Sequence, residues 1–481
     1  MKSPRADGLV DVDSMKGDGG MVLSDSRVYA IAFAWCAAVT VLVHGPMLFK
    51  PHAEGDELVY YVLSQRMGWD LSNYTTKDDP RVNDLPYTIY RGPVFHHPPL
   101  LPLVLKAGSQ FTMNPLLSLP GVVTPRAKTD PRSFVVPSEC VAAAFAFEVF
   151  VCVAALWYVW RFLALVGVEP AFGVAALVGL TVCPLVLFST VRIHHDGLMG
   201  LMLVCGLVAF AEAIERERVL GAVEAAIWLV AAMNVRFNAV AALPVILLMP
   251  FYRATGGRTT GYQGTGDRPR SLPGRGTAAL KNIARPRPPW LVVGIVFLAV
   301  LTAGLQHYVR LFAAYGTLWP SAMIHPLPGV AKFSPLLAMV ERMNRAWVLW
   351  ELAAMFPLAL LFVAPWNLRV LFADLRARRW PAMFVTAFGF LFAVQLVFAF
   401  KPVRYFAAVT PLMHLCWPYL LRIKAPNVWL GWSAWGLAGV TVLLMITTGF
   451  FNATLHDPDQ AAVIPSLVFY WPPLLNGYRA H

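Results

Sequence analysis

Long apolar runs separated by short polar connections recur along almost the whole chain. The first, Val28 to Phe49, is too long for the core of a signal peptide, and no small-residue cleavage pattern follows it. With 58% hydrophobic and 14% charged residues and a mean hydropathy of +0.58, the chain lies outside the range of soluble domains. A backbone in hydrocarbon must satisfy its own hydrogen bonds, so each run predicts a helix. The sequence therefore predicts an all-α polytopic membrane protein.

We count about eleven runs of membrane-crossing length. They are Val28–Phe49, Ser138–Leu163, Ala171–Thr190, Gly197–Ile214, Val219–Val235, Phe237–Phe251, Trp290–Tyr308, Ala346–Val363, Ala382–Phe400, Tyr405–Leu421 and Trp429–Phe450. One membrane domain, residues 28–450, is the simplest division of the chain. Residues 1–27 are mixed in charge and predict a disordered cytoplasmic tail, and residues 451–481 predict a short outer tail.

The run Pro98–Met113 decides the topology. If it lies in the interface as a juxtamembrane helix, the connection 253–289, with eight basic residues and Asp267 alone against them, is cytoplasmic. If the run crosses, that basic loop faces outside, which the positive-inside rule disfavours. We therefore predict that the long loop 50–137 lies outside and contains juxtamembrane helices. The net charge of +12 reflects such topology signals and not a nucleic-acid partner.

This topology places the polar clusters on one face. Lys50–Pro137, Val191–Asp196, Val309–Arg345 and Lys401–Arg404 all lie outside, on the non-cytoplasmic side. The six cysteines fall in or beside apolar runs without a CxxC pair, so we interpret them as small core residues and predict no metal site from them.

The first polar cluster is GDELVYY, which places Asp56 and Glu57 a few residues after the first span, followed by Tyr60 and Tyr61. The two acids either cap a helix that begins there or supply a general base, because partial desolvation raises the proton affinity of a carboxylate. The residues alone leave both possibilities open.

The second cluster leads into an apolar helix through a proline pair, in the order Tyr90, Arg91, His96 and His97. Prolines suit the first turn of a helix, so the histidines are expected at the membrane surface, near the depth of a lipid phosphate. They are either interfacial polar groups or an anion-binding or proton-relay pair. A zinc site is less favoured, because His194 and His195 lie on a separate turn.

The third cluster is VRIHHDG, in which His194 and His195 precede Asp196 at the start of a predicted span. Asp196 suits a helix N-cap, and it equally suits a second active-site acid that orients an acceptor or a cation. The fourth cluster places Lys401 and Arg404 at the start of the tenth span. These cations either anchor the helix at the headgroups or hold a phosphate.

Three further arginines are weaker candidates for holding a phosphate: Arg236, Arg310 and Arg342.

The order of these clusters resembles the C-type glycosyltransferase superfamily, in particular bacterial protein O-mannosyltransferases and the transferases that add aminoarabinose or galacturonic acid to lipid A. The likeness covers residues 28–425 and rests on short patterns: the Asp-Glu pair, His97-Pro-Pro, the Asp that opens the fourth span, and RYxxxxxP from Arg404 to Pro411.

The resemblance implies an inverting transfer of a sugar from a polyprenyl-phosphate donor to a lipid, protein or glycan acceptor. It assigns the base to Asp56 with Glu57 beside it, the donor phosphate to His96 or His97 and Arg404, and a second outer-loop acid to Asp196. Lys401 joins the phosphate group, and the tyrosines, Arg91 and the His194–His195 pair are expected around the substrate. No cofactor is implied, although a divalent cation is possible, and a bacterial inner or plasma membrane is favoured over the endoplasmic reticulum.

Two departures and two rival functions stand beside this hypothesis. Some relatives carry lysine where this chain has His97, and the lumenal insert of eukaryotic O-mannosyltransferases has no counterpart here. Secondary transport and a non-catalytic membrane subunit also fit many spans. Transporters usually show repeated halves and ionisable or broken segments at mid-membrane. We detect no repeat, and the predicted spans are nearly free of acids apart from Glu148 and Glu224.

Overall fold

The computed structural model describes residues 25–45, 48, 52–53, 56–77, 79, 82, 97–110, 134–166, 168–190, 193, 195–252, 290–316, 360–397, 403–423 and parts of 428–443. The predicted tails, the basic connection 253–289 and most of the predicted spans Ala346–Val363 and Trp429–Phe450 lie outside these residues.

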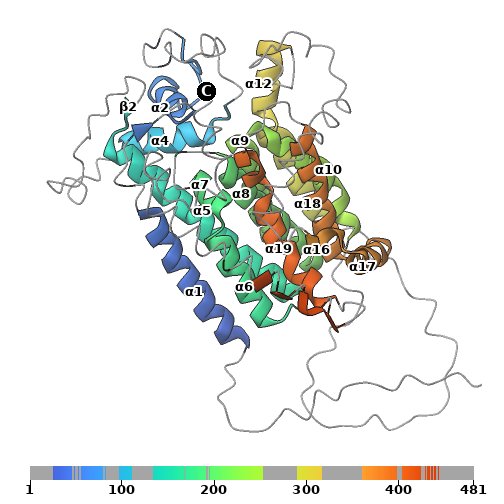
Figure 1. Ribbon diagram of the computed structural model, residues 1–481. Helices are drawn as coiled ribbons and strands as arrows, with labels where there is room; N and C mark the ends of the chain where they lie inside the picture. The colour runs from blue at the N-terminus through green and yellow to red at the C-terminus, as the bar shows by residue number, and fades with distance from the viewer. Residues whose placement is uncertain are drawn as a thin grey trace, which may run out of the picture.

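The described chain is helical apart from one short β pair (Figure 1). Its elements are α1 (Asp25–His44), β1 (His52–Ala53), α2 (Asp56–Arg66), α4 (Leu100–Gln110), β2 (Phe134–Val135), α5 (Ser138–Leu165), α6 (Pro170–Thr181), α7 (Pro184–Thr190), α8 (Asp196–Arg216), α9 (Val219–Val235), η4 (Phe237–Ala242), α10 (Leu243–Leu248), η5 (Met249–Phe251), α11 (Trp290–Ala299), η6 (Val300–Gly304), α12 (Gln306–Tyr315), α16 (Leu360–Val363), α17 (Pro365–Arg376), α18 (Trp380–Val397), η9 (Val403–Ala408) and α19 (Thr410–Arg422).

Among the described residues, four helices are long and apolar enough to cross a membrane: Arg27–His44, Glu139–Leu165, Asp196–Arg216 and Trp290–Ala314. Large apolar side chains on the outer helices are exposed, as expected where lipid replaces water as the solvent. Examples are Ile31 and Leu42 on α1, Leu220 and Ile227 on α9, and Leu291 and Leu298 on α11. The chain is therefore an α-helical membrane protein.

Two predicted spans are interrupted. Ala171–Thr190 is divided into α6 and α7 at Pro184, because proline cannot donate the backbone hydrogen bond that a continuous helix needs. Phe237–Phe251 forms the succession η4, α10 and η5, with Pro244 and Pro250 close to its two junctions. These segments are shorter than the sequence predicts, although they remain apolar and helical.

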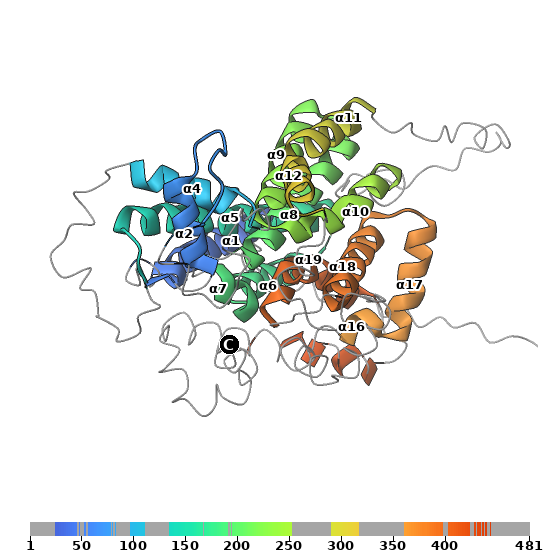
Figure 2. The ribbon, with the colours of Figure 1, turned by 90° about the horizontal axis from the view of Figure 1, so that it is seen from above.

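Helix α8 forms the centre of the bundle. All residues from Asp196 to Ile214 are buried, and the helix packs against α5, α7, α9, α19 and η9 (Figure 2). Glycines allow this close packing: a Cβ at Gly200 would lie 2.8 Å from the carbonyl carbon of Ala408 and closer still to its oxygen. Gly200 thus brings η9, a late segment of the chain, against the first turn of α8.

The loop between the first two long helices covers one end of the bundle, the upper end in Figure 1, where α2, α4 and α12 lie. The two ends of this loop are joined by the antiparallel pair β1–β2, in which His52 lies opposite Val135. Helix α4 buries Leu101 and Leu105 and, with 11 residues, is about 16 Å long, too short to cross a bilayer. Helix α4 lies within the run Pro98–Met113, for which the sequence predicts a juxtamembrane helix.

A histidine joins two helix ends at the upper end. The Nε2 atom of His44, the last residue of α1, lies 2.9 Å from the hydroxyl of Thr190, the last residue of α7. Its Nδ1 atom is 2.8 Å from the carbonyl oxygen of Thr40. The end of α1 and the end of α7, which leads toward His195 and Asp196, are therefore held side by side.

All six cysteines are buried, in agreement with their predicted place in the core.

Replacing Gly200 by alanine tests the contact between α8 and η9. We expect G200A to lower the free energy of unfolding by about 1–3 kcal/mol, because the added methyl group displaces the backbone of Ala408. Thermal unfolding in detergent measures the loss. Gly294→Ala is the matched control, since Gly294 is exposed on α11 and no described residue lies within 4 Å of its Cβ position. Equal stability of the two variants would contradict this account.

Candidate functional site

A buried ion pair lies at the upper end of α8. Asp196, the first residue of the helix, is 0% exposed, and its Oδ1 atom pairs with the guanidinium of Arg236, which is 3% exposed. The N-cap position belongs to His195, so Asp196 places its carboxylate in the first turn and does not cap the helix. The positive end of the helix dipole and the guanidinium both favour the ionised carboxylate there.

Arg236 lies where the backbone changes direction between α9 and η4. Helix α9 ends at Val235, and Arg236 adopts an extended conformation (φ −150°, ψ 135°) before η4 begins. The hydroxyl of Tyr308 on α12 donates to the carbonyl oxygen of Arg236 at 3.4 Å. Arg236 is one of the weaker phosphate candidates in the sequence, and in the structure it pairs with a carboxylate of the protein.

Next to this pair, one tyrosine and two histidines form a second buried group. The Tyr60 hydroxyl hydrogen-bonds to Nδ1 of His195 and lies 3.2 Å from Nδ1 of His97. The Tyr60 ring stands nearly perpendicular to both imidazoles, with interplanar angles of 87° and 84° and centroid separations of 5.1 and 5.5 Å. His195 Nε2 lies 3.7 Å from Oδ1 of Asp196, which links the two groups. We call these residues, Tyr60, His97, His195, Asp196 and Arg236, the upper cluster.

Segments from distant parts of the chain position the upper cluster. Tyr60 comes from α2, His97 from the segment before α4, and His195 from the turn before α8. The hydroxyl of Tyr74 donates to the carbonyl oxygen of His97, which fixes the backbone at that histidine. The Tyr74 ring in turn meets that of His307 on α12, at 5.8 Å between centroids.

Burial and nearby positive charge lower the pKa of His97 from 6.5 to about 3. Desolvation is the largest cause, and the electrostatic interactions with Arg236 and His307 act in the same direction. His97 is therefore a neutral imidazole at physiological pH. It can donate or accept one hydrogen bond per nitrogen, but it cannot supply a fixed positive charge to a phosphate.

The structure describes the remaining predicted residues to different extents. Helix α2 begins at Asp56, as expected for an acid at a helix N-terminus, although the Asp56 side chain lies outside the described residues. Glu57 and Tyr61 are buried at 8% and 7% exposure. The backbone of Arg404 lies in η9, and its side chain is outside the described residues. Outside the description altogether are Tyr90, Arg91, His96, His194, Lys401 and Arg342.

The Nη1 atom of Arg310 donates to the carbonyl oxygen of Leu71 at 3.3 Å and so ties α12 to the segment that follows α2.

Three contributors near the upper cluster were not predicted: Tyr74, His307 and Tyr308. The last two follow η6, a π-helical segment in which the amide of Leu305 bonds to the carbonyl oxygen of Val300 five residues back. This segment rotates the helix that follows it. A regular helical periodicity along Trp290–Tyr308 therefore predicts the wrong face of the helix for His307 and Tyr308. The sequence QHYVR at the end of an apolar run was the available signal.

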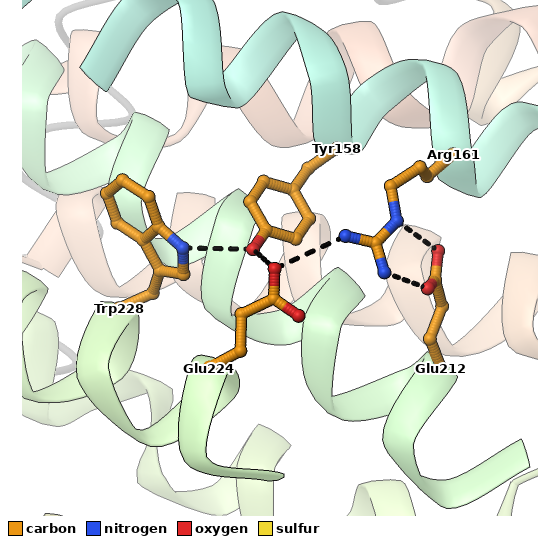
Figure 3. Close-up of polar contacts among 5 residues, drawn as sticks. All are labelled: Tyr158, Arg161, Glu212, Glu224 and Trp228. Carbon is orange, nitrogen blue, oxygen red and sulfur yellow. Dashed lines mark hydrogen bonds and ion pairs between the residues drawn. The ribbon is translucent and has the colours of Figure 1, made fainter. Parts of the chain in front are cut away.

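A second polar cluster joins α5, α8 and α9 farther down the bundle (Figure 3). Arg161 forms a bidentate ion pair with Glu212, and its Nη1 atom lies 3.3 Å from Oε1 of Glu224. The Tyr158 hydroxyl donates to Glu224 and accepts from Nε1 of Trp228 at 3.0 Å. Glu212 lies 16 residues after Asp196, or about 24 Å along α8. Sequence analysis singled out Glu224 but missed Glu212.

Among the described residues, no group of three or more His, Cys, Asp or Glu side chains is arranged to hold a metal ion. No known protein-family model matches the chain, and no curated protein matches it in sequence.

Removing Arg236 is expected to destabilise the fold strongly. R236Q leaves the Asp196 carboxylate buried without its cation, at a cost of about 3–5 kcal/mol. Unfolding of the purified protein in detergent measures this loss. The double variant D196N/R236Q is the control, because neutral partners remove the buried charge, and it should recover much of the stability. If R236Q is as stable as the unchanged protein, the ion pair does not hold the cluster.

The lowered pKa of His97 predicts a pH dependence. Between pH 6.5 and about 3 the unfolded chain binds a proton at this histidine and the folded protein does not, so the free energy of unfolding falls as the pH is lowered through that range. Nitrogen-15 NMR of histidine-labelled protein at pH 5 should show His97 neutral, with H97Q identifying its signals. A protonated His97 at pH 5 would refute the burial account.

Proposed function

We propose that the protein is a glycosyltransferase that transfers a sugar from a polyprenyl-phosphate donor to an acceptor hydroxyl at the membrane surface. The acceptor oxygen attacks the anomeric carbon, the bond from that carbon to the phosphate oxygen breaks, and polyprenyl phosphate leaves with the electron pair. The configuration at the anomeric carbon is inverted. The resemblance to C-type glycosyltransferases is the source of this hypothesis.

The observation that carries the proposal is the upper cluster itself. Titratable side chains from α2, the segment before α4, the start of α8 and the end of α9 converge at one end of the bundle. Burying a charged pair costs desolvation energy, and an apolar contact could join the same helices without that cost. Perturbed ionisable groups gathered in this way are typical of sites of chemistry.

An apolar cavity near the cluster suits the lipid part of the donor. It has a volume of about 370 Å³, within the usual range for ligand sites, and lies among α16, α18, η9 and α19. Its wall η9 packs on the first turns of α8, through Gly200, so cavity and cluster share a structural element. The lining residues are Phe362, Val363, Val385, Phe388, Gly389, Phe392, Phe406, Val409, Thr410 and Met413.

The finer assignments belong to the same proposal. Asp56 with Glu57 is the base that the resemblance assigns, and His96, Lys401 and Arg404 are the candidates for the donor phosphate. We propose about eleven spans in residues 28–450, a location in a bacterial plasma membrane and a site on its non-cytoplasmic side. The acceptor is a lipid, a protein or a glycan, and a divalent cation is an optional addition.

Sugar transfer in membranes that contain the protein tests the proposal. With polyprenyl-phosphate mannose and polyprenyl-phosphate arabinose as labelled donors, the unchanged protein should consume one donor, and D196N should reduce the rate at least about 100-fold. Glu217→Gln is the control, because Glu217 is an exposed acid just beyond the other end of α8. Donor stability in the presence of the unchanged protein would favour a transporter or a non-catalytic subunit. Full activity of D196N would show that sugar transfer does not depend on the upper cluster.

A further inference from the structure

Helix α17 lies across the long helices of the bundle. Figure 1 shows it nearly end-on, whereas Figure 2, turned by 90°, shows it along its length. With 12 residues, Pro365–Arg376, it is about 18 Å long and too short to cross a bilayer. A short helix in this orientation can lie parallel to a membrane surface.

Helix α17 is tied to the end of the bundle that is opposite the upper cluster. Nε1 of Trp380, the first residue of α18, donates to Oε1 of Glu215 at 2.8 Å. Glu215 lies 19 residues after Asp196, or about 28 Å along α8. Near the end of α19, the hydroxyl of Tyr419 donates to Asp374 of α17. The C-terminal end of α17 is therefore level with the end of α8, a helix long enough to cross a membrane, and so lies at a membrane surface.

One face of α17 packs on the bundle and another is exposed. Asn367, Leu371 and Asp374 form the packed face and are 0%, 5% and 4% exposed. Leu368 and Phe372 lie one turn apart on the other face, at 36% and 60% exposure. Apolar side chains that follow each other along the outer face of an interfacial helix are expected where acyl chains cover them.

Arginines lie beside these two apolar side chains. Arg369 and Arg376 are seven residues apart and share the exposed side of α17, and Arg378 is exposed in the turn that follows. Among the described residues, no carboxylate pairs with these three guanidinium groups. The acid of α17, Asp374, is turned inward and pairs with Arg379 at 3.0 Å. The exposed face of α17 therefore has three positive charges that no described acid neutralises.

We propose that the exposed face of α17, formed by Leu368, Arg369, Phe372, Arg376 and Arg378, binds an anionic phospholipid. The guanidinium groups hold the phosphate and the acidic headgroup, and the two apolar side chains contact the upper part of the acyl chains. Arginine suits this role because its planar N–H groups donate to two phosphate oxygens at once. Its long stem also keeps the charge at headgroup depth while the helix lies lower.

Net charge selects the class of lipid. Every phospholipid carries a phosphate, but in a zwitterionic lipid an ammonium group cancels it. Three unpaired arginines on one face therefore favour a lipid with a net negative charge. This inference goes beyond the proposed function and does not depend on it.

A bound lipid would also steady the helices that α17 connects. Helix α16 ends at Val363 just before α17, and α18 begins at Trp380 just after it. Both helices line the apolar cavity, together with α19. Because a ligand that binds only the folded state raises its stability, anionic lipid should raise the Tm of the protein.

Lipid binding to the full-length protein in a neutral detergent tests the proposal. Native mass spectrometry with phosphatidylglycerol and phosphatidylcholine should show tighter binding of phosphatidylglycerol. The variant R369Q/R376Q/R378Q should bind phosphatidylglycerol about 100-fold more weakly, or about fivefold for each arginine, and should lose the rise in Tm. These side chains are exposed and without described partners, so the variant is expected to fold.

The matched control removes the same charge elsewhere. R27Q/R216Q/R218Q changes three arginines that are exposed on α1 and at the turn between α8 and α9, and it should keep the affinity for phosphatidylglycerol. An equal loss in both triple variants, or equal affinity of the unchanged protein for the two lipids, would overturn the proposal. Displacement of the lipid by an equal concentration of inorganic phosphate would show a site for free phosphate and overturn it as well.

A depth measurement distinguishes a lipid from a water-borne partner. All six native cysteines are buried, so Phe372→Cys offers an exposed position to a spin label. In phosphatidylglycerol bilayers, oxygen should relax this label more strongly than a water-soluble nickel chelate does. Leu220→Cys on α9, at 75% exposure, is the reference for a lipid-facing position. A label at residue 372 that responds mainly to the nickel chelate would place the exposed face of α17 in water and overturn the proposal.

Discussion

The buried pair of Asp196 and Arg236 is the interaction on which the upper end of the molecule depends. A carboxylate in an apolar bundle is stable only with a cation at contact distance, so the start of α8 and the end of α9 must meet. His195 links this pair to Tyr60, which in turn contacts His97. His195 is carried by the turn that precedes Asp196, and Tyr308 packs against the backbone of Arg236.

The antiparallel pair α8 and α9 is also tied toward its other end. Arg161 from α5 bridges Glu212 on α8 and Glu224 on α9, about 24 Å along α8 from the first pair. Between the two ties, α8 is wholly apolar at its contacts and completely buried. Charged contacts near both ends and close apolar packing between them fix the two helices in register as well as in distance.

The sequence predicted an α-helical membrane protein, because hydropathy depends on composition alone. It also predicted candidate residues that meet in the structure, Tyr60, His97, His195 and Asp196, since each follows a recognisable local pattern. It could not predict that Arg236 pairs with Asp196, because partner choice depends on packing across 40 residues of chain. Pro184 marks the break between α6 and α7 in the sequence, but the length of the apolar run predicted one continuous span.

The π-helical segment η6 divides the long apolar helix Trp290–Ala314 into two parts with separate orientations. One extra residue in a turn rotates the downstream helix by about 100° relative to an uninterrupted α-helix. The lipid-facing side of α11 and the side of α12 that carries His307 and Tyr308 are therefore set independently. Asn234 holds the junction by donating to the carbonyl oxygen of Ala303 at 3.2 Å. Chain length in this turn is consequently under tighter constraint than side-chain identity: losing a single residue would restore a regular helix and turn both aromatic groups away from the cluster.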